Sequence, residues 1–210
     1  MKKAIVLSFA AILFMHPVSA QGNLNTCNNE RKRQMGGITP GPDMDQETMK
    51  KLSRVNTDWL KCAEGKTIPY FKERTLAGEK INAGVLAGKV LVINFWFVAC
   101  SPCVAEIPAL NKLVTEYKNE NVRFLSVTHD QKWTVTDFLK SRPFNFDIIY
   151  NAAFTTDEFG VASFPTTFVI DQNGKIVKAW MGGSTGPDAN EQAYTRIKPV
   201  LDELLRTVSH

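Results

Sequence analysis

The stretch VINFWFVACSPCVAEIP, residues 92–108, decides how the rest of the chain is interpreted. It opens on a mostly apolar run that is typical of a strand buried on both faces. Two cysteines, Cys100 and Cys103, follow in a C-x-x-C spacing, and a helical pattern begins with them. A cysteine at the start of a helix is stabilised as thiolate by unpaired backbone N–H groups and the helix dipole. The stretch therefore predicts a reactive Cys100, with Cys103 one turn behind it to resolve a mixed disulfide.

Three uses of this cysteine pair compete: a metal site, a structural disulfide and a redox centre. A structural zinc site needs four ligands, and the sequence has no second C-x-x-C or H-x-x-x-H partner. A disulfide that closes so short a loop restrains little of the unfolded chain. Redox exchange is therefore the favoured use, and no metal or other cofactor is expected.

Strand and helix patterns alternate along the chain after the cysteines. A helical segment at 104–118 precedes the buried strand VRFLSVT, and the helix TVTDFLKS precedes the strand FDIIY. TTFVI and KIVKAW then flank a DQNG turn, before a helix near 189–206. This order predicts an α/β sandwich with a central mixed β-sheet flanked by helices.

Two motifs carry a resemblance to a known family. GKVLVINFWFVACSPCVAEIPALNKL, followed by GVASFPTTFVIDQNGKIV, resembles the exported thiol-disulfide oxidoreductases of the TlpA and ResA type, which have the thioredoxin fold. The resemblance covers residues 65–207 and implies a thioredoxin-like domain at 65–210. FDIIYNAAFTTDEFG resembles the insert that these exported proteins carry before their cis-proline, and it is the place where partner specificity is expected.

The resemblance also assigns residues to a site. Cys100 matches the attacking cysteine of the family and Cys103 the resolving one. Pro165 matches the cis-proline that faces the disulfide, where the backbone of Phe164, Pro165 and Thr166 is expected to pair with a substrate's extended chain. A cis X-Pro bond costs only about 0.5–1 kcal/mol over trans. Two roles stay open for the bulky Phe164 side chain: it packs against Trp96 or Phe97, or it contacts the substrate.

Glu106 matches the acidic residue that the family places three positions after the second cysteine. Three positions are about one helical turn, so the carboxyl group can approach the thiols from below. Partly buried, it would move protons to and from a departing thiolate, and as an anion it would raise the thiol pKa values. The alternative is a solvated helix glutamate. Asn94, where cytosolic thioredoxins carry a buried aspartate, favours Glu106 as the local acid.

The first twenty residues, MKKAIVLSFAAILFMHPVSA, predict a cleaved secretory signal. Two lysines precede a twelve-residue apolar run, which is shorter than the roughly 20 residues of a membrane span. We expect export to the periplasm; membrane association, including a lipoprotein form, stays open. Cleavage leaves 23 basic and 21 acidic residues, a net charge of +2, which indicates no nucleic-acid partner.

Residues 21–64 are expected to form an N-terminal extension with one helix. Residues 21–42 are rich in Asn, Gly and Pro and predict an irregular segment that adds little to the core. An amphipathic pattern then runs from Asp43 to Gly65, with Cys62 near its end. We predict a disulfide between Cys27 and Cys62; a lipidated or free Cys27 is the alternative.

The favoured function is an exported reductant of disulfides in client proteins, by resemblance those of apocytochromes c or other cysteine proteins. Oxidation or isomerisation of client disulfides by the same dithiol stays open, because the Ser101-Pro102 dipeptide does not fix the reduction potential. A thiol protein of the membrane would supply its electrons, and we expect a monomer. One alternative is a copper-binding or assembly module that uses Cys100, Cys103 and His129 as ligands, although His129 is typical of a surface loop. A peroxiredoxin is disfavoured because Phe97 occupies the position where that family needs a threonine.

Overall fold

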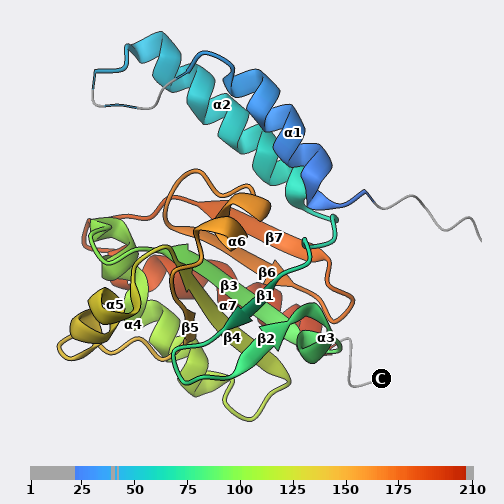
Figure 1. Cartoon of the computed structure of the whole chain (residues 1–210), viewed down its shortest axis with the longest axis vertical. Helices are drawn as coiled ribbons and strands as arrows, with labels where there is room; N and C mark the ends of the chain where they lie inside the picture. The colour runs from blue at the N-terminus through green and yellow to red at the C-terminus, as the bar shows by residue number, and fades with distance from the viewer. Residues whose placement is uncertain (1–21, 39–40, 42, 207–210) are drawn as a thin grey trace, which may run out of the picture.

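The computed structural model describes residues 22–38, 41 and 43–206 of the 210-residue chain, and the predicted signal at 1–20 lies outside them. Along the chain, the elements are α1 (Leu24–Met35), α2 (Gln46–Ala63), β1 (Lys72–Arg74), β2 (Lys80–Asn82), α3 (Ala83–Leu86), β3 (Val90–Trp96), α4 (Ser101–Glu116), β4 (Val122–Thr128), α5 (Lys132–Leu139), β5 (Asp147–Ile149), α6 (Ala153–Glu158), β6 (Thr166–Ile170), β7 (Ile176–Met181) and α7 (Ala189–Arg206). Figure 1 shows their arrangement.

A five-stranded mixed sheet forms the centre of the molecule, in the order β5-β4-β3-β6-β7. Strands β3, β4 and β5 are parallel, whereas β6 is antiparallel to β3, and β7 to β6. Every residue of β3 is buried, as its continuous apolar run predicts. The predicted α/β sandwich with a mixed sheet is therefore confirmed.

Apolar side chains cover both faces of the sheet. On one face, α4, α5 and α7 pack against Val92 and Val169 through residues such as Leu110, Val135 and Ile197. The other face is covered by α1, α2, the β1–β2 hairpin and the end of α6. There the packing residues include Leu24, Trp59, Phe71, Ile81 and Phe159, around Phe95 and Phe168 of the sheet.

The expectation of an irregular segment at 21–42 is wrong, because residues 24–35 form helix α1. Leu24 and Cys27 are almost fully buried, so the segment adds to the core. Its sequence is polar and has no clear apolar stripe, which is why periodicity misses it. The helix is stabilised by tertiary contacts, as short helices in proteins usually are. The extension therefore has two helices, which lie side by side in Figure 1.

The helix predicted after Asp43 is present as α2. Asp45 caps it, because its carboxylate accepts a hydrogen bond from the Thr48 N–H at 2.6 Å. Trp59 and Ala63 direct the last turns of α2 onto the core. Among the described residues, none of the helices combines the length and apolar character that crossing a bilayer requires.

Candidate active site

Cys100 and Cys103 lie at the junction of β3 and α4. Cys100 is the N-cap residue of α4, and its Sγ accepts a hydrogen bond from the Cys103 N–H at 3.3 Å. The two sulfur atoms form a disulfide. The exposed fraction is 5% for Cys100 and 1% for Cys103. Cys100 is thus the less buried of the two cysteines, and it lies at the positive end of a sixteen-residue helix, where a thiolate is stabilised.

Pro165 begins the approach to β6, and the Phe164–Pro165 peptide bond is cis. The next residue, Thr166, pairs with Phe95 near the end of β3, so the sheet brings Pro165 to the same end as the cysteines. Gly183 lies where the loop that contains Pro165 and the loop that contains the two cysteines approach each other. A Cβ added to it would lie 3.1 Å from the Pro165 ring and 3.5 Å from Cβ of Pro102.

Gly183 is therefore a site residue that the sequence reasoning missed. The side chain of Pro102, between the two cysteines, and the ring of Pro165 approach each other across a position that only glycine fits without displacement. Gly182 adds a backbone link, because its N–H donates to the Pro165 carbonyl at 2.8 Å. The signal in the sequence that could have indicated Gly183 is the Gly-Gly pair that directly follows β7, in MGGS at 181–184.

The residues that flank Pro165 face different surroundings. Thr166 is fully buried, and its hydroxyl group donates to the Ser163 carbonyl at 2.7 Å. Its side chain therefore points into the protein. The half-buried Phe164 ring packs edge-on against Phe97 at 5.3 Å and lies 5.8 Å from the His129 ring. Phe97 and His129 also contact each other at 5.3 Å, so His129 belongs to an aromatic group beside the cysteine loop.

Glu106 is buried beneath the cysteines on α4, with 7% of its surface exposed. Asn94 of β3 donates a hydrogen bond to the carboxyl group at 2.8 Å and another to Thr167 at 3.0 Å. Burial raises the pKa of Glu106 to about 7, although the Asn94 bond and the charge of Arg196 favour the anion. The alternative that Glu106 is a solvated glutamate on the helix surface does not fit this buried environment.

A small cavity connects Glu106 to the proline loop. Its lining includes Glu106, Pro165, Gly182 and Arg196, and its volume is about 10 Å³. That volume holds roughly one water molecule. Glu106 therefore has room for about one water molecule beside it, in a space that Arg196 also borders.

Asp130 is a second residue that the sequence reasoning missed. Its carboxylate accepts hydrogen bonds from the Val98 N–H at 2.7 Å and from the Thr128 hydroxyl at 2.8 Å. Val98 is two residues before Cys100, so Asp130 holds the loop that leads to Cys100. The same signal that singled out His129, a polar residue after a strand at the sheet edge, also applied to Asp130.

Cys27 and Cys62 form a second disulfide, which lies apart from the first. It joins α1 to the last turn of α2, with 5.8 Å between the Cα atoms. Within the described part of the chain, no three His, Cys, Asp or Glu side chains converge as metal ligands. The copper ligand set of Cys100, Cys103 and His129 is therefore not assembled in this conformation.

Comparison with known proteins gives the chain's family. The model of the redoxin family matches residues 63–196. The thiol-disulfide oxidoreductase ResA of Halalkalibacterium halodurans is 34% identical over 137 residues, which cover 64% of this chain and 77% of that protein. The thioredoxin-like protein YneN of Bacillus subtilis is 32% identical over 133 residues, 61% of this chain and 78% of YneN.

Solved structures agree on the fold. A thiol:disulfide interchange protein of the thioredoxin family from Chlorobium tepidum superposes with a TM-score of 0.56, at 20% identity, over 66% of this chain and 95% of that one. The sheet order, the helix that Cys100 caps and these relatives lead to one assignment. The chain belongs to the redoxin family and is a thiol-disulfide oxidoreductase of the ResA type.

Proposed function

We propose that this protein reduces disulfides of client proteins outside the cytoplasm, with Cys100 as the attacking and Cys103 as the resolving cysteine. The observation that carries the proposal is the position of Cys100 as the N-cap of α4, with Cys103 enclosed behind it and Glu106 buried one turn on. A thiolate at Cys100 is stabilised by the helix, whereas Cys103 is reached only from inside the site.

Reduction then proceeds in two exchange steps. The Cys100 thiolate attacks one sulfur of a client disulfide, and the second client sulfur leaves as a thiolate that takes up a proton. Cys103, deprotonated, attacks Cys100 and releases the first client sulfur, so the Cys100–Cys103 disulfide forms. Two electrons pass from the protein to the client. A thiol protein of the membrane returns the pair to the dithiol.

Glu106 is proposed to handle the protons of these steps. A carboxyl group with a pKa of about 7 can both accept and donate a proton near neutral pH. The small cavity beside Glu106 has room for about one water molecule, with which the carboxyl group is proposed to exchange its proton. The backbone around Pro165, with Phe164 and Thr166, is proposed to pair with the client chain.

The cellular setting is part of the same proposal. Residues 1–20 are proposed as a cleaved signal that exports the protein to the periplasm, and 65–210 as the catalytic domain, with 21–64 as an added extension. The Cys27–Cys62 disulfide supports an oxidising compartment. Apocytochromes c are proposed clients, in which heme attachment requires free thiols.

The equilibrium reduction potential of the Cys100–Cys103 pair tests the direction of the reaction. A reductant should have a reduction potential of about −300 mV, whereas a potential of about −120 mV, typical of strong oxidases, would overturn the proposal. The Glu106→Gln variant is the test of the acid. Removing the carboxylate should lower the pKa of the Cys100 thiol; an unchanged pKa for both thiols would show that Glu106 has another role.

A further inference from the structure

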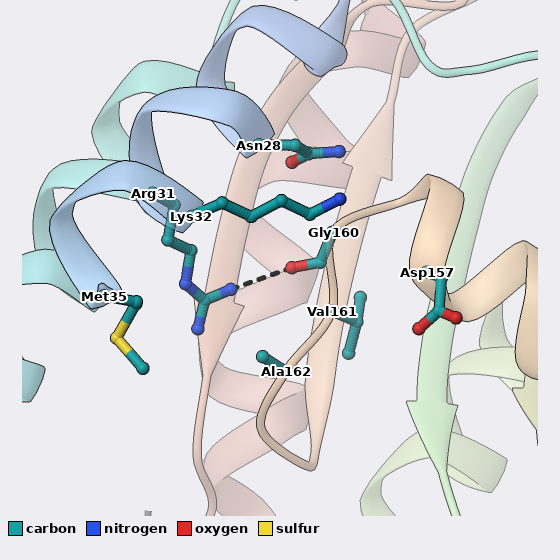
Figure 2. A pocket seen from close by; sticks show the side chains of 8 residues that line it. All are labelled: Asn28, Arg31, Lys32, Met35, Asp157, Gly160, Val161 and Ala162. Atoms are coloured by element: carbon teal, nitrogen blue, oxygen red, sulfur yellow. Dashed lines mark hydrogen bonds between the residues drawn. The ribbon is translucent and has the colours of Figure 1, made fainter. Parts of the chain in front are cut away.

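A cavity of about 430 Å³ lies between α1 and the chain that leads into Pro165. We call residues 159–165, which connect α6 to β6, the entry segment. Figure 2 shows one wall of the cavity formed by α1 and the other by α6 and the entry segment; its lining residues are Asn28, Arg31, Lys32, Met35, Asp157, Gly160, Val161 and Ala162. The family model begins at residue 63, so the α1 wall is an addition to the shared domain.

Arg31 is a buried cation beside this cavity, with 5% of its surface exposed. Its guanidinium donates to the Gly160 carbonyl at 2.8 Å and to Asn56 at 2.6 Å, and it lies over the Trp59 ring at 4.7 Å. These partners are all uncharged, and the enclosed Nε–H has none. None of the ion pairs among the described residues includes Arg31.

A buried charge is normally paired, since its desolvation is costly. Burial accordingly lowers the pKa of Arg31 from its usual value. Because the guanidinium is not neutralised by a carboxylate and lies in a region of low dielectric constant, its positive potential extends into the adjacent cavity. Arg31 thus contributes a positive potential to the cavity, whereas a direct contact with a bound group must come from another residue.

Lys32 can make that contact. Figure 2 shows its side chain extending from α1 towards Gly160, on the cavity side of the helix. The residue is exposed and takes part in none of the ion pairs among the described residues. Asp157, also exposed, places one negative charge on the opposite wall. Two cations against one anion leave the cavity positive, with Met35, Val161 and Ala162 as apolar surface.

The wall formed by the entry segment is held rigidly against α1. Asn28 donates to the Glu158 carbonyl at 3.0 Å and accepts a hydrogen bond from the Trp59 indole at 2.9 Å. Gly160 has a φ of +69°, and a Cβ there would overlap the Asn28 side chain. The cavity is therefore preformed, which reduces the entropy cost of binding.

We propose that this cavity binds an acidic side chain of the client polypeptide, a few residues from the cysteine that Cys100 attacks. The proposal rests on the proposed function. A client chain that pairs beside Pro165 and continues along the entry segment reaches Gly160 within five residues, a span of at most about 17 Å. The carboxylate meets Lys32 and the potential of Arg31, while its methylene groups contact the apolar surface.

The test uses two series of peptides whose single cysteine is in a mixed disulfide with thionitrobenzoate, a chromogenic leaving thiolate. One series carries glutamate and the other glutamine, at one to seven residues on either side of the cysteine. The reduced full-length protein should react about two- to fivefold faster with the glutamate peptide at one or two spacings, as a partly exposed ion pair allows. Salt should weaken this preference.

Two variants are expected to change the glutamate-to-glutamine rate ratio in opposite directions. Lys32→Gln should bring it close to one, and Asp157→Asn should increase it. Lys50→Gln and Asp58→Asn, exposed on α2 and outside the cavity, are matched controls that should leave it unchanged. No preference at any spacing, or one that neither cavity variant alters, would overturn the inference.

A binding measurement separates this inference from the proposed function. Peptides with serine in place of cysteine are titrated against the oxidised protein, so that no exchange is needed. Tighter binding of the glutamate peptide that Lys32→Gln abolishes supports the cavity even if every peptide disulfide reacts slowly. Equal binding of both series, with rapid exchange, would remove the cavity and leave the reductase proposal intact.

Discussion

Glu106 shows how the environment of one residue sets its chemistry. A glutamate on a helix surface ionises near its ordinary pKa of 4.5, but burial raises the pKa of Glu106 to about 7, even though the hydrogen bond from Asn94 favours the anion. The same carboxyl group is thereby changed from a permanent anion into a group that exchanges protons near neutrality. At Gly183 the absence of a side chain has the structural effect, because it lets Pro102 and Pro165 approach each other.

The raised pKa of Glu106 predicts a pH-dependent stability. The folded protein binds more protons than the unfolded chain between pH 4.5 and about 7, so the contribution of Glu106 is present below pH 4.5 and is lost as pH rises through the folded pKa. The free energy of unfolding should fall over this range by on the order of 3 kcal/mol. Urea unfolding at about pH 5 and pH 8, with both disulfides intact, measures the change.

Glu106→Gln is the control for this prediction, because the amide has nearly the same shape and does not titrate. Its free energy of unfolding should vary less with pH than that of the wild type. If both proteins show the same slope between these pH values, Glu106 does not have a raised pKa in the folded state.

At the scale of elements, the junction of β3 and α4 combines three constraints on the position of Cys100. The buried strand ends at Trp96, α4 begins at Ser101, and Asp130 holds the intervening loop through the Val98 N–H. Asp130 itself lies after β4, the parallel neighbour of β3. The carboxyl ends of two adjacent strands thus cooperate to position Cys100.

Asp130→Ala should loosen this loop. The Val98 N–H and the Thr128 hydroxyl would lose their acceptor, at a cost of about 1–3 kcal/mol. We expect faster hydrogen exchange of the Val98 amide, measured by NMR, and slower attack of Cys100 on a peptide disulfide. Asp130→Asn keeps an acceptor oxygen and should restore slow exchange. An unchanged Val98 amide in the alanine variant would contradict the positioning role.

For the whole molecule, the N-terminal extension is part of the packed structure. Helix α1 contributes Leu24 and Cys27 to the core on the face of the sheet opposite α4 and α7. It also donates hydrogen bonds from Asn28 and Arg31 to the backbone at residues 158 and 160. The segment that precedes Pro165 is therefore supported from outside the domain that the redoxin model covers.

The Cys27–Cys62 disulfide should contribute strongly to the stability of this arrangement. It closes a loop with a sequence separation of 35, for which chain entropy predicts about 4 kcal/mol. The double variant Cys27→Ser and Cys62→Ser should lose that amount in urea unfolding while Cys100 and Cys103 still pair. Mass spectrometry of the non-reduced wild-type protein that finds a free Cys62 would contradict the pairing.

Local patterns were sufficient to predict most strands and helices and their order along the chain. The apolar run of β3, the C-x-x-C at a helix start and the turn before β7 each have a local physical cause: continuous burial, the helix dipole and turn geometry. Residue spacing also placed Glu106 one turn beyond Cys103. None of these features requires knowledge of contacts between distant residues.

Helix α1 could not be predicted in this way, because its polar sequence has little helical periodicity. Its stability comes from contacts with residues about 25 to 150 positions away, among them Asn56 and Met181. The approach of Gly183 to Pro102 and Pro165, and the hold of Asp130 on Val98, are also long-range contacts.

The sequence by itself therefore determined the strands and helices, the cysteine pair and the position of Glu106 one turn beyond it, because these follow from local patterns along the chain. Only the tertiary structure decided how α1 meets the entry segment, how deeply Glu106 is buried and where the positive cavity lies. Those features depend on which surfaces from distant parts of the chain pack together and exclude water, and no local pattern of residues specifies which surfaces meet.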